Sequence, residues 1–157
     1  MSDGNQQRGK LYACALKTLE DDGWPIREVE GSALFRTSVD GESARISCFM
    51  DVMEEYQQLI FYAVAPIKVS EDRFPAAAEY LHRANYGLRI GNFEMDYADG
   101  EVRYKSSLDI EDGELLPKMV TNLAYTSARM MDKYLPGLMR VLYGDMEPAA
   151  AIEAIEG

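Results

Sequence analysis

Few residues in this chain are of the types that carry out chemistry, and their spacing matches no catalytic motif. There is one histidine, His82, and two cysteines, Cys14 and Cys48, neither of them in a CxxC pair. A metal site or a catalytic triad needs several such partners, so His82 alone is expected to have a surface or packing role. In a cytosolic protein the two cysteines are expected to be small buried hydrophobes rather than a disulfide.

Carboxylates are the other candidates for chemistry. Four of them cluster in the sequence: Asp109, Glu111, Asp112 and Glu114. The cluster lacks the D-x-D-x-D-G spacing with a distant Glu that an EF-hand calcium loop requires. Negative charge ahead of a helix, where the helix dipole favours it, explains the cluster better. Phosphate-binding glycine loops and a GxSxG serine elbow are also missing from the sequence. We therefore predict no enzyme activity, no cofactor and no metal.

The composition is that of one folded domain with a large acidic excess. The chain is predicted to form a single domain over 1–157, with about residues 1–8 frayed. Its 27 acidic residues against 16 basic ones give a net charge of −11. That charge would repel nucleic acid and an anionic membrane. Neither a signal-peptide pattern nor an apolar run of about 20 residues occurs, which favours a cytoplasmic protein.

Hydrophobic periodicity predicts the secondary structure. Helical spacing predicts three helices and a short fourth one, at about 6–21, 71–85, 113–144 and 148–156. Alternation predicts three strands and then a hairpin, at 35–39, 44–52, 58–65 and 90–110. The fold class is therefore α+β, an antiparallel sheet flanked by helices in the order α-β-β-β-α-β-β-α(-α). A kink or break is expected near 133–136, because Pro136 lies inside the long helix.

The hairpin over 90–110 offers a specific register. A two-residue loop at Asp99-Gly100 would place Asp96 opposite Arg103 and Glu94 opposite Lys105. Opposite charges then match on one face and apolar residues on the other. We predict this register.

The third strand is apolar on both faces. It contains the run Leu59-Ile60-Phe61-Tyr62-Ala63-Val64-Ala65. In an antiparallel sheet with one solvated face, such a run would expose large side chains. Either packed helices or a second subunit must therefore cover both sides. We predict a candidate dimer or partner surface on this strand, made of Leu59, Ile60, Phe61, Tyr62 and Val64.

The order of elements and several local patterns are similar to those of a known family. The patterns are Trp24-Pro25, the run 59–65, Ala84-Asn85-Tyr86-Gly87, the segment 90–95, the hairpin residues 99–104, Tyr134-Leu135-Pro136 and the tail 144–152. In these features the chain resembles the YbjN-like family, described as bacterial sensory transduction regulators, and the class I type III secretion chaperone-like fold. The resemblance implies a homodimer with a regulatory or chaperone-like role, and it supplies no catalytic residue.

Two functions follow as hypotheses. The preferred one is a non-catalytic protein-binding module that forms a homodimer and binds an unidentified protein client. The alternative is a small-molecule-binding regulator with a pocket between the sheet and the long helix. The nine methionines fit either core packing or an adaptable binding groove. An enzyme would require two converging carboxylates in a cleft.

Overall fold

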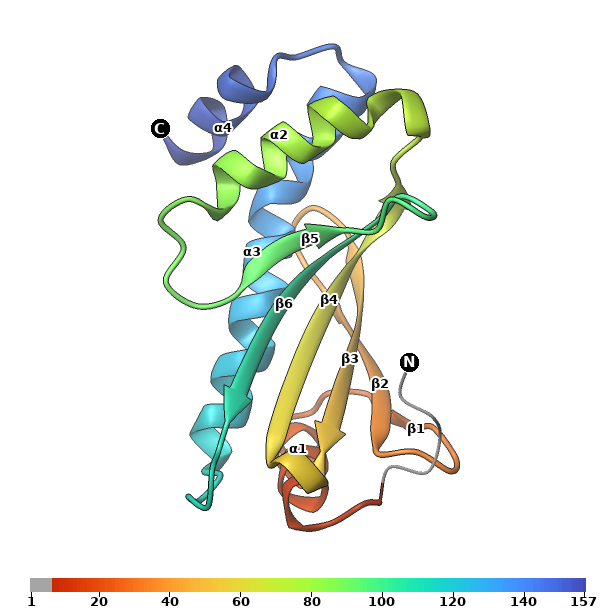
Figure 1. The fold of residues 1–157 in the computed structure, drawn as a ribbon, viewed down its shortest axis with the longest axis vertical. Helices are drawn as coiled ribbons and strands as arrows, with labels where there is room; N and C mark the ends of the chain where they lie inside the picture. Colours follow the sequence, from red (N-terminus) through yellow and green to blue (C-terminus); the bar gives the residue numbers. More distant parts are fainter. Residues whose placement is uncertain (1–6) are drawn as a thin grey trace.

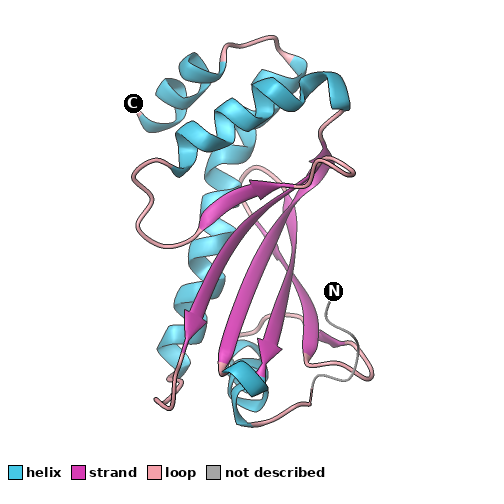
Figure 2. Cartoon of the chain, viewed as in Figure 1, coloured by secondary structure: helices cyan, strands magenta, loops and turns pink. Residues whose placement is uncertain are grey.

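Six antiparallel strands form one sheet in the order β1-β2-β3-β4-β6-β5 (Figures 1 and 2). The computed structural model describes residues 7–157. The strands are β1 Arg27–Glu28, β2 Leu34–Asp40, β3 Arg45–Met53, β4 Gln58–Lys68, β5 Asn92–Met95 and β6 Glu101–Asp109. The helices are α1 Lys10–Asp21, α2 Phe74–Asn85, α3 Pro117–Tyr143 and α4 Pro148–Glu156, with short 3-10 turns at Glu54–Tyr56 and Glu71–Arg73. The predicted α+β class and element order are confirmed, and β1 is an additional short strand.

Buried and more exposed side chains alternate along the strands. The buried ones point to the face of the sheet that helices cover, and the others point to the face that they do not cover. Phe61 of β4 lies on the covered face, where its ring centroid is 6.1 Å from that of Trp24, just after α1. Ser106 of β6 lies on the same face and donates a hydrogen bond to the Leu123 carbonyl of α3 at 3.2 Å. Figure 1 looks onto the opposite face, where β6 passes in front of α3 and no helix of residues 7–157 crosses β3, β4 or β6.

Pro136 lies inside α3, which continues past it to Tyr143, so of the predicted kink or break the break does not occur. Proline has no N–H, and the carbonyl of Asp132, four residues earlier, therefore lacks its helical donor. Ser43 replaces that donor, because its Oγ donates to the Asp132 carbonyl at 3.0 Å. The Asp132 carboxylate also accepts the backbone N–H groups of Glu42 and Ser43, at 2.9 and 2.8 Å. The β2–β3 loop is thus attached to α3 at the proline.

The β5–β6 hairpin exists as predicted, but its register is wrong by two residues. Glu94 pairs with Arg103 rather than with Lys105. The loop is longer than two residues because the Asp96 carbonyl accepts the N–H of Gly100 at 2.7 Å, with Gly100 at φ +80°. A left-handed φ of this kind favours glycine. A shift of two residues leaves each side chain on its predicted face.

The N-terminal segment is attached near the sheet edge. Residues 1–6 of the segment predicted to fray lie outside the described residues. Arg8 donates to the carbonyls of Ser32 and Val29 at 2.8 and 2.9 Å, which fixes the chain beside the loop before β2. The N-terminus of α1 is held from the 3-10 turn at Glu54–Tyr56, where Glu54 accepts the N–H of Tyr12 at 2.8 Å.

Candidate partner-binding face

Strand β4 carries all five residues predicted as a partner surface, and the structure divides them between its two faces. Leu59 and Phe61 lie on the helix-covered face and are both 0% exposed. Ile60, Tyr62 and Val64 lie on the opposite face. A partner could reach Leu59 or Phe61 only if α1 or α3 moved away. Their assignment to a partner surface is therefore corrected: they belong to the core.

Cross-strand pairing arranges the uncovered face in three rows, which run from β2 through β3 and β4 to β6. The central row is Arg36, Phe49, Tyr62 and Lys105. The two flanking rows are Leu34, Asp51, Ile60 and Ser107, and Ser38, Ser47, Val64 and Arg103. We call this surface the open face. Its apolar side chains lie mostly at the centre and its polar ones at the borders, as in the core and rim of a protein interface.

Tyr62 at the centre of the open face is shielded by its neighbours. The Phe49 ring stacks on it with a centroid separation of 4.5 Å and an interplanar angle of 28°. The Arg103 guanidinium lies 4.0 Å from the Tyr62 centroid on β6, in the geometry of a cation–π contact. Tyr62 is consequently only 9% exposed, while Ile60 and Val64 are half-buried. The apolar side chains on this face therefore partly cover one another, and less of their surface is exposed than the sequence predicts.

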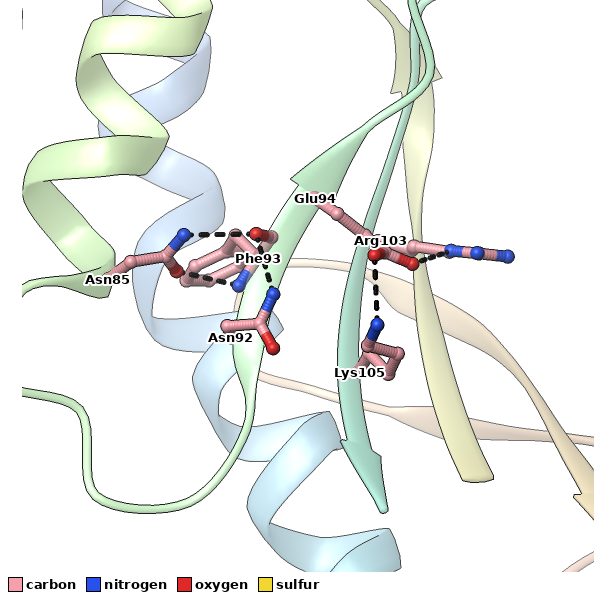
Figure 3. Close-up of polar contacts among 6 residues, drawn as sticks. All are labelled: Asn85, Asn92, Phe93, Glu94, Arg103 and Lys105. Atoms are coloured by element: carbon pink, nitrogen blue, oxygen red, sulfur yellow. Dashed lines mark hydrogen bonds and ion pairs between the residues drawn. The ribbon is translucent and has the colours of Figure 1, made fainter. Parts of the chain in front are cut away.

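Glu94 of β5 orients Arg103 above Tyr62. Its carboxylate forms an ion pair with Arg103 and a second one with Lys105 at 3.2 Å (Figure 3). All three side chains are about one-third exposed, so solvent screens the pairs and each contributes at most about 1 kcal/mol. Burial raises the pKa of the Tyr62 hydroxyl. The hydroxyl is therefore protonated at neutral pH and can donate a hydrogen bond.

Asp51 is the carboxylate beside the apolar centre. It lies between Leu34 and Ile60 in its row. Burial raises the pKa of this carboxyl. A polypeptide that covers the open face would remove more water from Asp51 and raise the pKa of its carboxyl further.

Asn85 closes the outer edge of β5 opposite Phe93. The side chain of Asn85, at the end of α2, imitates a neighbouring strand: its Oδ1 accepts the Phe93 N–H at 2.7 Å and its Nδ2 donates to the Phe93 carbonyl at 3.0 Å (Figure 3). Asn92 donates to the same carbonyl at 3.1 Å. Strand addition at Phe93 is blocked, because its backbone groups are already paired.

The residue types singled out for chemistry are dispersed. His82 is exposed on α2. Both cysteines are free thiols; Cys48 is buried, as predicted, whereas Cys14 is only half-buried. Burial raises the pKa of the Cys48 thiol to about 12, which leaves it unreactive at neutral pH. Within residues 7–157, no three His, Cys, Asp or Glu side chains are placed to hold a metal ion. The described helices also include none with the length and apolarity to cross a bilayer.

The structure contains a cavity that was predicted only in outline. It measures about 440 Å³ and lies between β6, α3 and the loop before β5. The alternative function places a pocket between the sheet and the long helix, and this cavity has that position. Sequence periodicity could indicate the helix and the strand, but the third wall comes from the loop at Arg89–Gly91, whose path no pattern predicts.

Comparison with known proteins gives the family. The model of the YbjN family, described as "Putative bacterial sensory transduction regulator", matches residues 16–139. The chain belongs to the YbjN family. A search of curated proteins finds no match.

Two solved structures have a fold similar to that of this YbjN-family chain. The first is YbjN from E. coli, "a putative transcription regulator": TM-score 0.56, 14% identity, covering 77% of this chain and 85% of that one. The second is the ExsC–ExsE complex: TM-score 0.50, 13% identity, covering 78% and 91%. The predicted type III secretion chaperone-like fold is thereby confirmed. Regulation is what the family description states, and neither structure is named as an enzyme.

Proposed function

We propose that this chain is a non-catalytic regulatory protein of the cytoplasm that binds polypeptide through its open face. Two copies form a homodimer, and the dimer binds a protein client. The observation that carries this proposal is the open face itself, a sheet surface without helix cover whose centre consists of Ile60, Tyr62, Val64 and Phe49. The ExsC–ExsE complex, a protein of similar fold bound to another protein, supports a protein partner.

Covering the open face would stabilise a complex through apolar burial. Full burial of an Ile, Val or Phe side chain contributes roughly 1.5–3 kcal/mol, and half-buried residues such as Ile60 and Val64 retain part of that gain. Two sheets that pack face to face are about 10 Å apart, with interdigitating side chains. The stacked rings of Phe49 and Tyr62 offer a rigid surface for such packing.

Sedimentation equilibrium of Val64→Lys tests the homodimer. Val64 is half-buried and points away from α1 and α3. A lysine at this position can therefore extend to solvent in the monomer, but not in a dimer whose open faces are in contact. We expect two chains for the wild type at micromolar concentration and one chain for the variant. Ile152→Lys, which changes a half-buried apolar residue on α4, is the matched control and should remain a dimer.

A monomeric wild type would contradict the homodimer, as would a Val64→Lys variant that is still dimeric while folded by circular dichroism. Loss of the dimer in Ile152→Lys as well would indicate a general loss of structure rather than a specific surface.

A second candidate function, a small-molecule-binding regulator, is favoured by one observation. The cavity of about 440 Å³ lies between β6 and α3 and is separate from the centre of the open face. A ligand that binds only the folded chain raises its melting temperature, so a thermal-shift panel of metabolites separates this function from simple protein binding.

A further inference from the structure

The cavity between β6 and α3 has the size and composition of a ligand site. Its volume of about 440 Å³ falls within the roughly 300–1,000 Å³ of small-molecule pockets. Its apolar wall consists of Leu108, Met119 and Leu123, which are half-buried or buried. The third wall is the loop from α2 to β5, which curves out beside α3 in Figure 1.

That loop is held close to β6 by a glycine. Gly91 has φ +78°, and a Cβ at this position would lie 2.5 Å from the Lys105 carbonyl oxygen. A larger residue would push the loop outward, both through this contact and through the left-handed φ. Tyr104 reinforces the closure, because its hydroxyl donates to the Ile90 carbonyl. The cavity is thus a defined feature of the fold.

Polar groups without internal partners converge on this cavity. Arg89 and Asn122 line it and are exposed, and neither side chain makes a hydrogen bond or ion pair within the described part of the chain. The β6 backbone is also open here. Odd-numbered β6 residues turn their backbone toward β5, as Glu101 does in accepting the Asp96 N–H at 2.9 Å. Ser107, also odd-numbered, turns its backbone to the same side of β6. It lies beyond the last β5–β6 pair, Asn92 and Lys105, so its backbone groups have no partner on β5.

The charge at this cavity is opposite to that of the whole chain. The chain carries −11, yet the ten lining residues include two cations, Arg89 and Lys105, and no carboxylate. Lys105 forms an ion pair with Glu94, whereas Arg89 forms no ion pair with any residue of 7–157. A cationic mouth above an apolar wall attracts a molecule with an anionic head and an apolar body.

We propose that this cavity binds a small amphiphilic anion, an apolar chain or ring of a few carbons that carries a carboxylate or a phosphate. The apolar body would lie against Leu108, Met119 and Leu123. The head group would be held by Arg89 and Lys105, with the Ser107 N–H and the Asn122 amide as additional donors. This inference deepens the second candidate function. Lys105 and Ser107 also belong to the rows of the open face, whereas Arg89, Asn122 and the apolar wall do not.

Titration with octanoate, followed by calorimetry and by amide NMR shifts, tests the proposal. We expect one saturable site, with the largest shifts at Gly91, Ser107 and Asn122. Arg89→Gln should weaken binding roughly twofold to fivefold, the contribution of a solvent-exposed charge pair. Arg83→Gln, an exposed arginine on α2 outside the cavity, is the matched control and should bind as the wild type does. The uncharged 1-octanol should bind more weakly than octanoate, and octyl phosphate shows which head group is preferred.

Asn122→Trp should abolish octanoate binding, because the exposed helix position tolerates an indole that fills the cavity. Its fold is checked by circular dichroism. Unchanged octanoate affinity in Asn122→Trp, shifts centred on Tyr62, or no saturable binding to the wild type would each overturn the proposal. The outcome is distinct from that of the dimer test, since Val64→Lys changes the open face and is read by sedimentation.

Discussion

The hydroxyl of Thr37 is a buried polar atom without a hydrogen bond. Thr37 lies on the helix-covered face of β2 and is 8% exposed, and its Oγ1 has no partner among residues 7–157. A buried unsatisfied hydroxyl costs about 1–3 kcal/mol. Thr37→Val keeps the branched shape, so we expect it to raise the free energy of unfolding by about 1 kcal/mol in urea denaturation. Thr37→Ser is the control: it keeps the hydroxyl and loses a methyl, and it should be less stable than the wild type.

A Thr37→Val variant that is less stable than the wild type would show that the hydroxyl has a stabilising partner in solution, such as an ordered water molecule.

Individual residues of β4 could be predicted only in part. A strand that is apolar on both sides gives no indication of which residues face the helices, so sequence alone groups Leu59 and Phe61 with Ile60, Tyr62 and Val64. The neighbouring strand β3 contains that information, because Ser47 and Asp51 alternate with buried Cys48 and Met50. Pairing of β3 with β4 transfers this alternation to β4. The stacked pair Phe49 and Tyr62 requires the register, which periodicity alone does not supply.

At the scale of elements, the attachment of the β2–β3 hairpin to α3 depends on Asp132. Asp132→Ala removes the acceptor of two loop N–H groups. By analogy with the loss of a helix cap, we expect it to lower the free energy of unfolding by about 1–2 kcal/mol. Hydrogen exchange of the Glu42 and Ser43 amides should become faster, because both lose their acceptor. Asp132→Asn retains an acceptor oxygen and should have a smaller effect; wild-type exchange rates in Asp132→Ala would contradict this role.

The same attachment explains why element boundaries were harder to predict than element types. Pro136 predicts a kink or break in α3 from local sequence, but Ser43, 89 residues away from Asp132, supplies the missing donor and the helix does not break. The β5–β6 register failed for a local reason. A shift of two residues keeps the faces and still brings Glu94 to Lys105 as a diagonal neighbour at 3.2 Å, so charge matching did not distinguish the two registers.

At the scale of the whole molecule, the order of elements was sufficient for the fold class, because helices and antiparallel strands alternate in a way that few architectures allow. The cavity was not predictable in the same way, since its walls come from three segments whose contacts are set by the tertiary fold. The two proposed functions use surfaces of different shape and charge. The open face is broad and fit for polypeptide, whereas the cavity at the β6–α3 junction is small and cationic.

The central claim is that polypeptide covers the open face in solution. Its most direct test is the effect of a soluble gadolinium chelate on the methyl NMR signals of Ile60 and Val64 over a range of protein concentrations. We predict that relaxation of both methyl groups by the chelate decreases as the dimer forms, while that of Leu116, an exposed residue next to α3 (49%), remains unchanged. Methyl groups of Ile60 and Val64 that remain equally accessible at all concentrations would contradict the claim.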